Sequence, residues 1–112
     1  MFKGIIRSMS AVCTNATVQD VQLDAIRNDM HIRWKQVTGI DETGAATTCQ
    51  VGFKRGTQFY PLRGTNIAAA NRSVRLWGDV HLPGEFVPCA RFYGATLADT
   101  LLLVAAGEVE SD

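Results

Sequence analysis

The sequence predicts an all-β fold, a two-sheet antiparallel sandwich of about eight strands arranged like a jelly roll. Apolar and polar residues alternate in short runs, as in strands that bury one face. Gly, Asn, Asp and Pro separate these runs at an even spacing. The sequence contains no heptads and no long stretch with helical period. Alternation does not give the order of the strands, so a closed barrel is the main alternative.

The length of 112 residues suits one domain. We expect a single β-sandwich over residues 1–112, with an N-terminal arm over about residues 1–10 and a frayed acidic tail over about residues 108–112. The apolar fraction of 46% and the charged fraction of 20% are ordinary for a folded domain. We therefore expect no extensive disorder in the body of the chain.

The first half of the chain holds four expected strands, over residues 2–9, 17–23, 31–37 and 47–54. In the third strand, Arg33 and Lys35 alternate with apolar residues and should point to solvent. The same alternation predicts the core-facing residues of the second to fourth strands, which are Val21, Leu23, Ile32, Trp34, Cys49, Val51 and Phe53.

The second half holds strands over residues 58–62, 73–77, 85–93 and 100–106, with residues 80–82 either continuing the 73–77 strand or beginning the next. Pro61 cannot donate to a ladder, so its strand should lie at an edge or end there. Residues 65–72 are expected to form a long loop, and residues 66–71 have the composition of one helical turn. Pro83-Gly84 is a strong turn signal.

Metal and thiol chemistry has little support. His31 and His81 show no ligand spacing relative to the three cysteines, Cys13, Cys49 and Cys89. The odd and widely spaced cysteines argue against a disulfide framework, so reduced thiols packed as small apolar groups are expected. We expect no metal and no cofactor.

Catalytic motifs are also lacking. The sequence has no Gly-x-Ser-x-Gly elbow and no phosphate-binding glycine loop. Asp41 and Glu42 are adjacent on an expected loop, where a solvated turn is a simpler interpretation than an acid–base pair. The prediction is therefore a protein that is not an enzyme.

A basic stretch interleaved with aromatics raises nucleic-acid binding as an alternative; it comprises Lys54, Arg55, Phe59, Tyr60, Arg63, Arg72, Arg75 and Trp77. Aromatics beside cations line grooves that bind single strands. The 11 basic and 11 acidic residues leave no net charge, whereas general nucleic-acid binders carry excess positive charge. A solvated sheet face beside core aromatics is therefore the favoured interpretation, with nucleic acid not expected as a partner.

Membrane and export signals are not found. The longest apolar run, residues 101–106, is far shorter than the ~20 residues that span a bilayer. The first residues carry positive charge without the apolar core of a signal peptide. We expect synthesis in the cytoplasm, with no signal peptide and no membrane partner.

The turn-rich end of the chain resembles a known family; the matching positions are Leu82, Pro83, Gly84, Glu85, Arg91, Phe92, Gly94, Asp99 and Leu101. Upstream, Arg33-Trp34 followed by residues 41–47 fits the same succession of strand, turn and strand. Over roughly residues 1–107 the chain resembles small β-sandwich virion proteins of tailed bacteriophages, especially capsid decoration (cement) proteins.

The resemblance implies a structural virion protein that sits on the capsid exterior and stabilises the shell by protein–protein contacts. The implied partners are the major capsid protein and copies of the chain itself, as a homotrimer. A tail or fibre location is a close variant. The alternative from another class is a small β-sandwich binding module for a glycan or single-stranded nucleic acid.

Candidate interface residues follow from the enrichment of aromatics and Arg at protein contacts. They are Phe2, Ile5 and Ile6 in the N-terminal arm, Phe59 and Tyr60 in an aromatic loop, and Arg55, Arg63 and Trp77. The competing interpretation is that Ile5, Ile6 and Trp77 belong to the core, because a small sandwich needs most of its large residues there.

Overall fold

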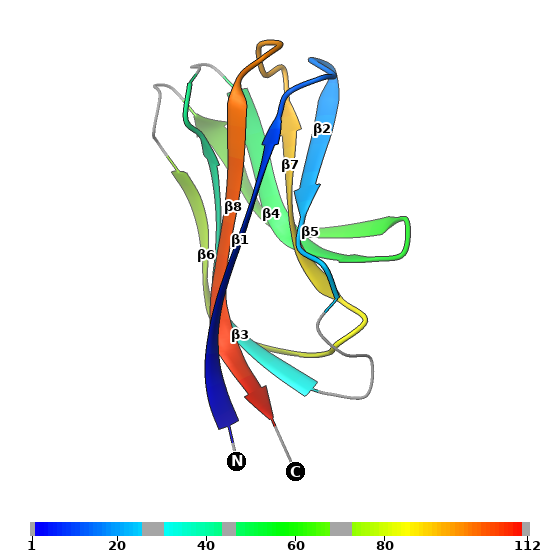
Figure 1. Ribbon diagram of the computed structural model, residues 1–112, viewed down its shortest axis with the longest axis vertical. Coiled ribbons are helices and arrows are strands. Elements are labelled where there is room, and N and C mark those ends of the chain that lie inside the picture. Colours follow the sequence, from blue (N-terminus) through cyan, green and yellow to red (C-terminus); the bar gives the residue numbers. More distant parts are fainter. Residues whose placement is uncertain (1, 26–30, 44–46, 68–72, 111–112) are drawn as a thin grey trace.

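A computed structural model describes residues 2–25, 31–43, 47–67 and 73–110 (Figure 1). These residues form eight strands and no helix. The strands are β1 (Phe2–Val12), β2 (Val18–Gln22), β3 (His31–Asp41), β4 (Thr47–Arg55), β5 (Gln58–Ile67), β6 (Ser73–Pro83), β7 (Val87–Tyr93) and β8 (Thr100–Glu110). The described part of the chain holds no helix long and apolar enough to span a bilayer.

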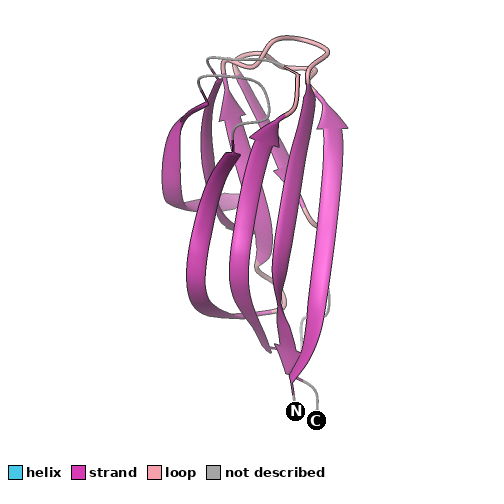
Figure 2. Ribbon diagram, turned by 90° about the vertical axis from the view of Figure 1, so that its left-hand side faces the viewer, coloured by secondary structure: helices cyan, strands magenta, loops and turns pink. Residues whose placement is uncertain are grey.

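The strands form two antiparallel sheets of four, which lie against each other as two layers (Figure 2). Sheet A has the order β1-β8-β3-β6 and sheet B the order β2-β7-β4-β5. The chain crosses repeatedly between the sheets, and this order is that of a jelly roll. The predicted sandwich is confirmed, and the closed barrel was the wrong alternative because two separate sheets are formed.

Several expected boundaries differ from the structure. β5 continues past Pro61 to Ile67, so the first residues of the expected loop belong to a strand. The strand with Pro61 does lie at the edge of sheet B, where a missing N–H costs least. β6 is one continuous strand, so residues 80–82 extend it. The remainder of the expected loop, residues 68–72, lies outside the described residues.

The described terminal segments of the chain are paired strands. The expected N-terminal arm is the edge strand β1, which pairs with β8 along its whole length. In that ladder Gly4 pairs with Glu108, and Phe2 pairs with Glu110. The prediction that the acidic tail frays from residue 108 was therefore wrong for residues 108–110, because β1 holds them.

The core is centred on Trp34 of β3, which packs on Phe53 of β4 with 6.4 Å between ring centroids. A β-bulge between Trp34 and Gln36 adds a residue to β3, so Trp34 and Val37 both face the core. The alternation had placed Ile32, Trp34, Cys49, Val51 and Phe53 inside, and all five are buried. Val37 was not predicted because a bulge breaks the period of two.

The absence of a side chain at Gly107 in β8 lets this strand lie close to Arg33 and Trp34 of β3. A Cβ at position 107 would lie 2.6 Å from the Arg33 carbonyl oxygen and 3.1 Å from Cε3 of Trp34. Because the nearest atom is backbone, a side chain at this position requires β3 and β8 to move apart.

Substitution of Gly107→Ala should lower the free energy of unfolding by about 1–3 kcal/mol, through this overpacking. Urea denaturation of the two proteins measures the effect. The control is Gly4→Ala in β1, where a Cβ would meet nothing within 4 Å. That variant should be neutral or slightly stabilising, since alanine restricts the unfolded chain. Equal effects of the two substitutions would contradict the steric argument.

Candidate functional site

A wholly apolar groove opens on the side of the sandwich where the edge strands β5 and β6 face each other. We call it the edge groove, and it is lined by Phe53, Tyr60, Leu62, Val80, Leu82 and Phe86. It encloses about 280 Å³. The β1–β2 side has a hollow of about 290 Å³ with mixed lining, which includes Arg7 and Asp24. Concave apolar surface is where binding partners usually find shape complementarity.

A bulge in the β4–β5 hairpin shapes one wall of the edge groove. Gly52 pairs with Pro61 and Val51 pairs with Arg63, so Leu62 is the extra residue of the bulge. A Cβ on Gly52 would overlap the Tyr60 carbonyl oxygen, so only glycine allows this approach. The bulge bends the hairpin and places Tyr60 and Leu62 together in the groove wall.

Arg55 contacts a residue of the groove lining, and Arg63 follows a lining residue in the sequence. The Arg55 guanidinium lies 5.5 Å from the centre of the Phe86 ring, and Phe86 packs 6.1 Å from Tyr60. Arg55 also forms a long ion pair with Glu85, 3.8 Å between nitrogen and oxygen. Arg63 follows Leu62, is exposed, and has no acidic partner among the described residues. The site is therefore an apolar hollow with the Arg55–Glu85 ion pair beside it.

The structure separates the candidate interface residues. Tyr60 lines the groove with 44% of its surface exposed, Arg55 contacts the neighbouring Phe86 ring, and Arg63 is exposed next to Leu62 in the sequence. Phe59 is only 8% exposed, because it packs 4.6 Å beneath the Arg91 guanidinium on the other side of the hairpin. The prediction of Phe59 as a surface contact was wrong, since Phe59 alternates with Tyr60 along β5.

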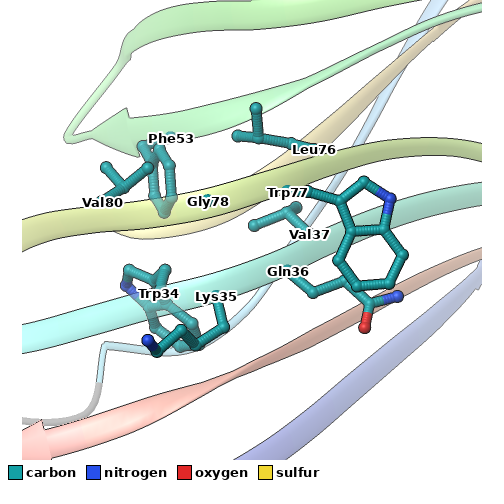
Figure 3. A pocket seen from close by; sticks show the side chains of 9 residues that line it. All are labelled: Trp34, Lys35, Gln36, Val37, Phe53, Leu76, Trp77, Gly78 and Val80. Atoms are coloured by element: carbon teal, nitrogen blue, oxygen red, sulfur yellow. The ribbon is translucent and has the colours of Figure 1, made fainter.

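The remaining candidates lie on sheet A. Ile5 packs partly against the core, as the competing interpretation held. Ile6 and Trp77 are 74% and 61% exposed, so they are not core residues. Figure 3 shows the Trp77 indole beside Gln36, its partner in the β3–β6 ladder. Phe2 of β1 pairs with Glu110 of β8, and the side chain of Phe2 is not among those that the structure describes.

The basic stretch does not form one surface. Asp20 accepts hydrogen bonds from Arg91 at 2.7 Å and from Lys54 at 3.0 Å, on the outer side of sheet B. The Arg91 and Lys54 partners hold the pKa of Asp20 below its usual value although burial acts against them. Arg75 lies on sheet A, and Arg72 lies outside the described residues. The cations are thus divided between the sheets, as expected for ordinary sheet faces.

Sequence reasoning missed four of the groove residues, Leu62, Val80, Leu82 and Phe86. The available signal was the alternation of Val80 and Leu82 with His81, which places both on one face of β6. The alternation does not show which strand this face of β6 contacts. The strand order decides this, because it places β6 opposite β5.

The loop end of the sandwich contains a buried pair of carboxyl groups, Asp41 and Asp99. Burial and the hydrogen bond with Asp41 raise the pKa of Asp99. Thr96 N–H also donates to Asp99 Oδ2 at 3.3 Å, as expected for an Asx residue in this loop. The solvated-turn interpretation holds for the exposed Glu42 but was wrong for Asp41, which is fully buried.

Backbone hydrogen bonds around this pair connect segments that are distant in the sequence. Cys13 N–H donates to the Asp99 carbonyl at 2.8 Å, and Glu42 N–H donates to the Thr100 carbonyl at 2.9 Å. These bonds tie the β1–β2 loop, the end of β3 and the β7–β8 loop together. The carboxyl pair therefore lies where three segments of the chain meet.

The thiols of Cys49 and Cys89 are fully buried. Burial raises the pKa of both Cys49 and Cys89 to about 12, so both thiols are protonated at neutral pH. A protonated, fully buried thiol is a packing group and a poor nucleophile. Among the described residues, no group of three or more His, Cys, Asp and Glu side chains is placed to hold a metal ion.

Comparisons with known proteins add no family: no family model matches the chain, and no curated protein matches its sequence. The resemblance to decoration proteins therefore stays a prediction from the turn motifs.

Replacing Asp99 with asparagine should make stability less sensitive to pH. A carboxyl whose pKa is raised on folding stabilises the fold below its unfolded pKa, and this contribution is lost as pH rises through the folded pKa. The asparagine side chain keeps an oxygen for the Thr96 N–H and carries no charge. Thermal unfolding should be measured from pH 3.5 to pH 8. Above about pH 4, the unfolding temperature of Asp99→Asn should rise relative to that of the wild type. A difference in stability that does not vary with pH would contradict a raised pKa of Asp99 in the folded protein.

Proposed function

We propose that this protein is a structural virion protein of the decoration type, which binds the outer surface of a capsid through its edge groove. The observation that carries the proposal is the groove itself, an apolar hollow open to solvent with Tyr60 and Leu62 exposed in its wall. The resemblance of the turn motifs to decoration proteins supplies the class of partner.

The chemistry of the groove fits a protein partner. Its volume of about 280 Å³ accommodates one or two large apolar side chains. Aromatic residues and Arg are enriched where proteins dock, and Tyr60, Phe86 and Arg55 lie together here. The exposed Arg63 favours a carboxylate close to those side chains. We therefore propose an apolar coat-protein segment with a neighbouring acidic residue as the occupant.

The groove is also rigid enough for this role. β4 holds Phe53 in the core, and the tilted Trp34–Phe53 contact fixes the floor of the groove. β6 supplies Val80 and Leu82 from a strand of eleven residues paired with β3. A docking surface carried on paired strands loses little entropy when it binds, which suits a protein that stabilises a shell.

The direct experiment is to image shells of the phage that encodes the chain, with and without added protein. Regular density on the outer face of every shell that received protein would support the proposal. Bare shells, or density only on tails or fibres, would contradict a capsid location. Salt-sensitive binding to oligonucleotides without shell binding would favour the alternative binding module.

Substitution of Leu62→Glu should reduce the shell-bound fraction about tenfold or more, because it places a carboxylate in the apolar groove. Cosedimentation of protein with shells measures this fraction. Leu62 is 54% exposed, so the change should leave the circular dichroism spectrum intact. The matched control is Leu97→Glu, at a similarly exposed leucine in the β7–β8 loop. Shell binding that survives Leu62→Glu would exclude the groove as the docking site.

A further inference from the structure

We infer that a second copy of this chain packs against the outer face of sheet A, the face directed away from sheet B, as a twofold pair in place of the homotrimer that the resemblance implies. This inference is independent of the proposed shell binding, because it uses a different surface. Four features carry it: the rows of side chains across the sheet, the composition of β8, the charges on the face, and its area.

The strand registers place one set of side chains in rows across this face. Gln36 of β3 is opposite Trp77 of β6 and Ala106 of β8, and Ala106 is opposite Ile6 of β1. The next two rows toward the loop end are Arg75, Thr38, Val104 and Ser8, and then Ser73, Ile40, Leu102 and Ser10. The first row ends in Ile6 on one side and Trp77 on the other. These are the most exposed large apolar residues described.

The composition of β8 indicates that both of its faces are covered. Leu101, Leu103 and Ala105 are completely buried in the core. The alternate residues, Leu102, Val104 and Ala106, point the other way and are also apolar. A strand with one face in water usually alternates apolar and polar residues, whereas a continuous apolar run is typical of a strand covered on both sides. In the single chain these three outward side chains are only partly buried.

The charges on the face favour an identical partner. Arg33 pairs with Glu108 at 2.8 Å, and Lys35 pairs with Asp79. The Arg75 guanidinium lies 5.9 Å from the Trp77 ring centre and has no acidic partner among the described residues. Because the pairs are balanced within one chain, a second copy meets almost no net charge. A strongly acidic or basic partner would find little complementary charge here.

The area of the face suits a pair. Its four strands each have eleven residues. At the usual strand spacing and rise, such a face covers about 700 Å². A stable interface buries about 800 Å² on each partner, so one face is close to sufficient. Two identical faces close as a twofold pair, with the sheets about 10 Å apart.

The experiment is sedimentation equilibrium of the whole chain, compared with the variants Ile6→Glu and Trp77→Ser. The wild type should sediment as a dimer of the 12.2 kDa chain. Each variant should weaken association about 30-fold or more, because it removes one of the two most exposed large apolar side chains of the face. Both residues are exposed, so circular dichroism should show unchanged strand content. The control Leu97→Glu should remain dimeric, and so should Leu62→Glu, which alters only the edge groove.

A second measurement needs no substitution. The chain has two tryptophans, and Trp34 is buried within the single chain. Quenching of tryptophan fluorescence by acrylamide should therefore increase on dilution as Trp77 becomes exposed. A monomer at high concentration, a trimer, or a dimer unaffected by Ile6→Glu and Trp77→Ser would overturn the twofold contact. None of these outcomes bears on the proposed shell binding, which the Leu62→Glu variant tests separately.

Discussion

The packing of Trp34 of β3 on Phe53 of β4 is the contact on which the rest of the structure depends. It joins an inner strand of one sheet to an inner strand of the other, with 6.4 Å between the rings. The β3 bulge turns Trp34 and Val37 to the same side, and Gly107 allows β8 to lie close beneath the indole. Phe53 belongs both to this core and to the floor of the edge groove, so the site is continuous with the most constrained part of the fold.

The jelly-roll order explains why apolar surface is left at the margins of a sandwich this small. Each sheet ends in unpaired edge strands, and the β5 and β6 edges meet at the groove rather than closing over it. The outer face of sheet A is a second apolar surface, on the opposite side of β6 from the groove. Surfaces of this kind are a liability for a lone monomer and an asset for a protein that functions within an assembly.

The polar groups buried in the structure serve the fold. Asp20 draws Arg91 and Lys54 onto sheet B, and the Asp41–Asp99 pair closes the loop end. Cys49 lies in the core, whereas Cys89 lies outside the main core cluster and is nonetheless fully buried. Chemical reactivity requires access as well as residue type, and here the thiols have none.

The sequence by itself determined the all-β class, the approximate strand positions and most of the core, because alternation records directly which face of a strand is apolar. It did not determine the β3 bulge, the burial of Asp41 or the pairing of the acidic tail, since each depends on a neighbour distant in the chain. Strand order was likewise undetermined, and it is strand order that brings Tyr60 and Leu62 of β5 to Val80 and Leu82 of β6. Only the tertiary structure could decide the groove, because a local pattern gives the direction of a side chain but not the side chain it meets.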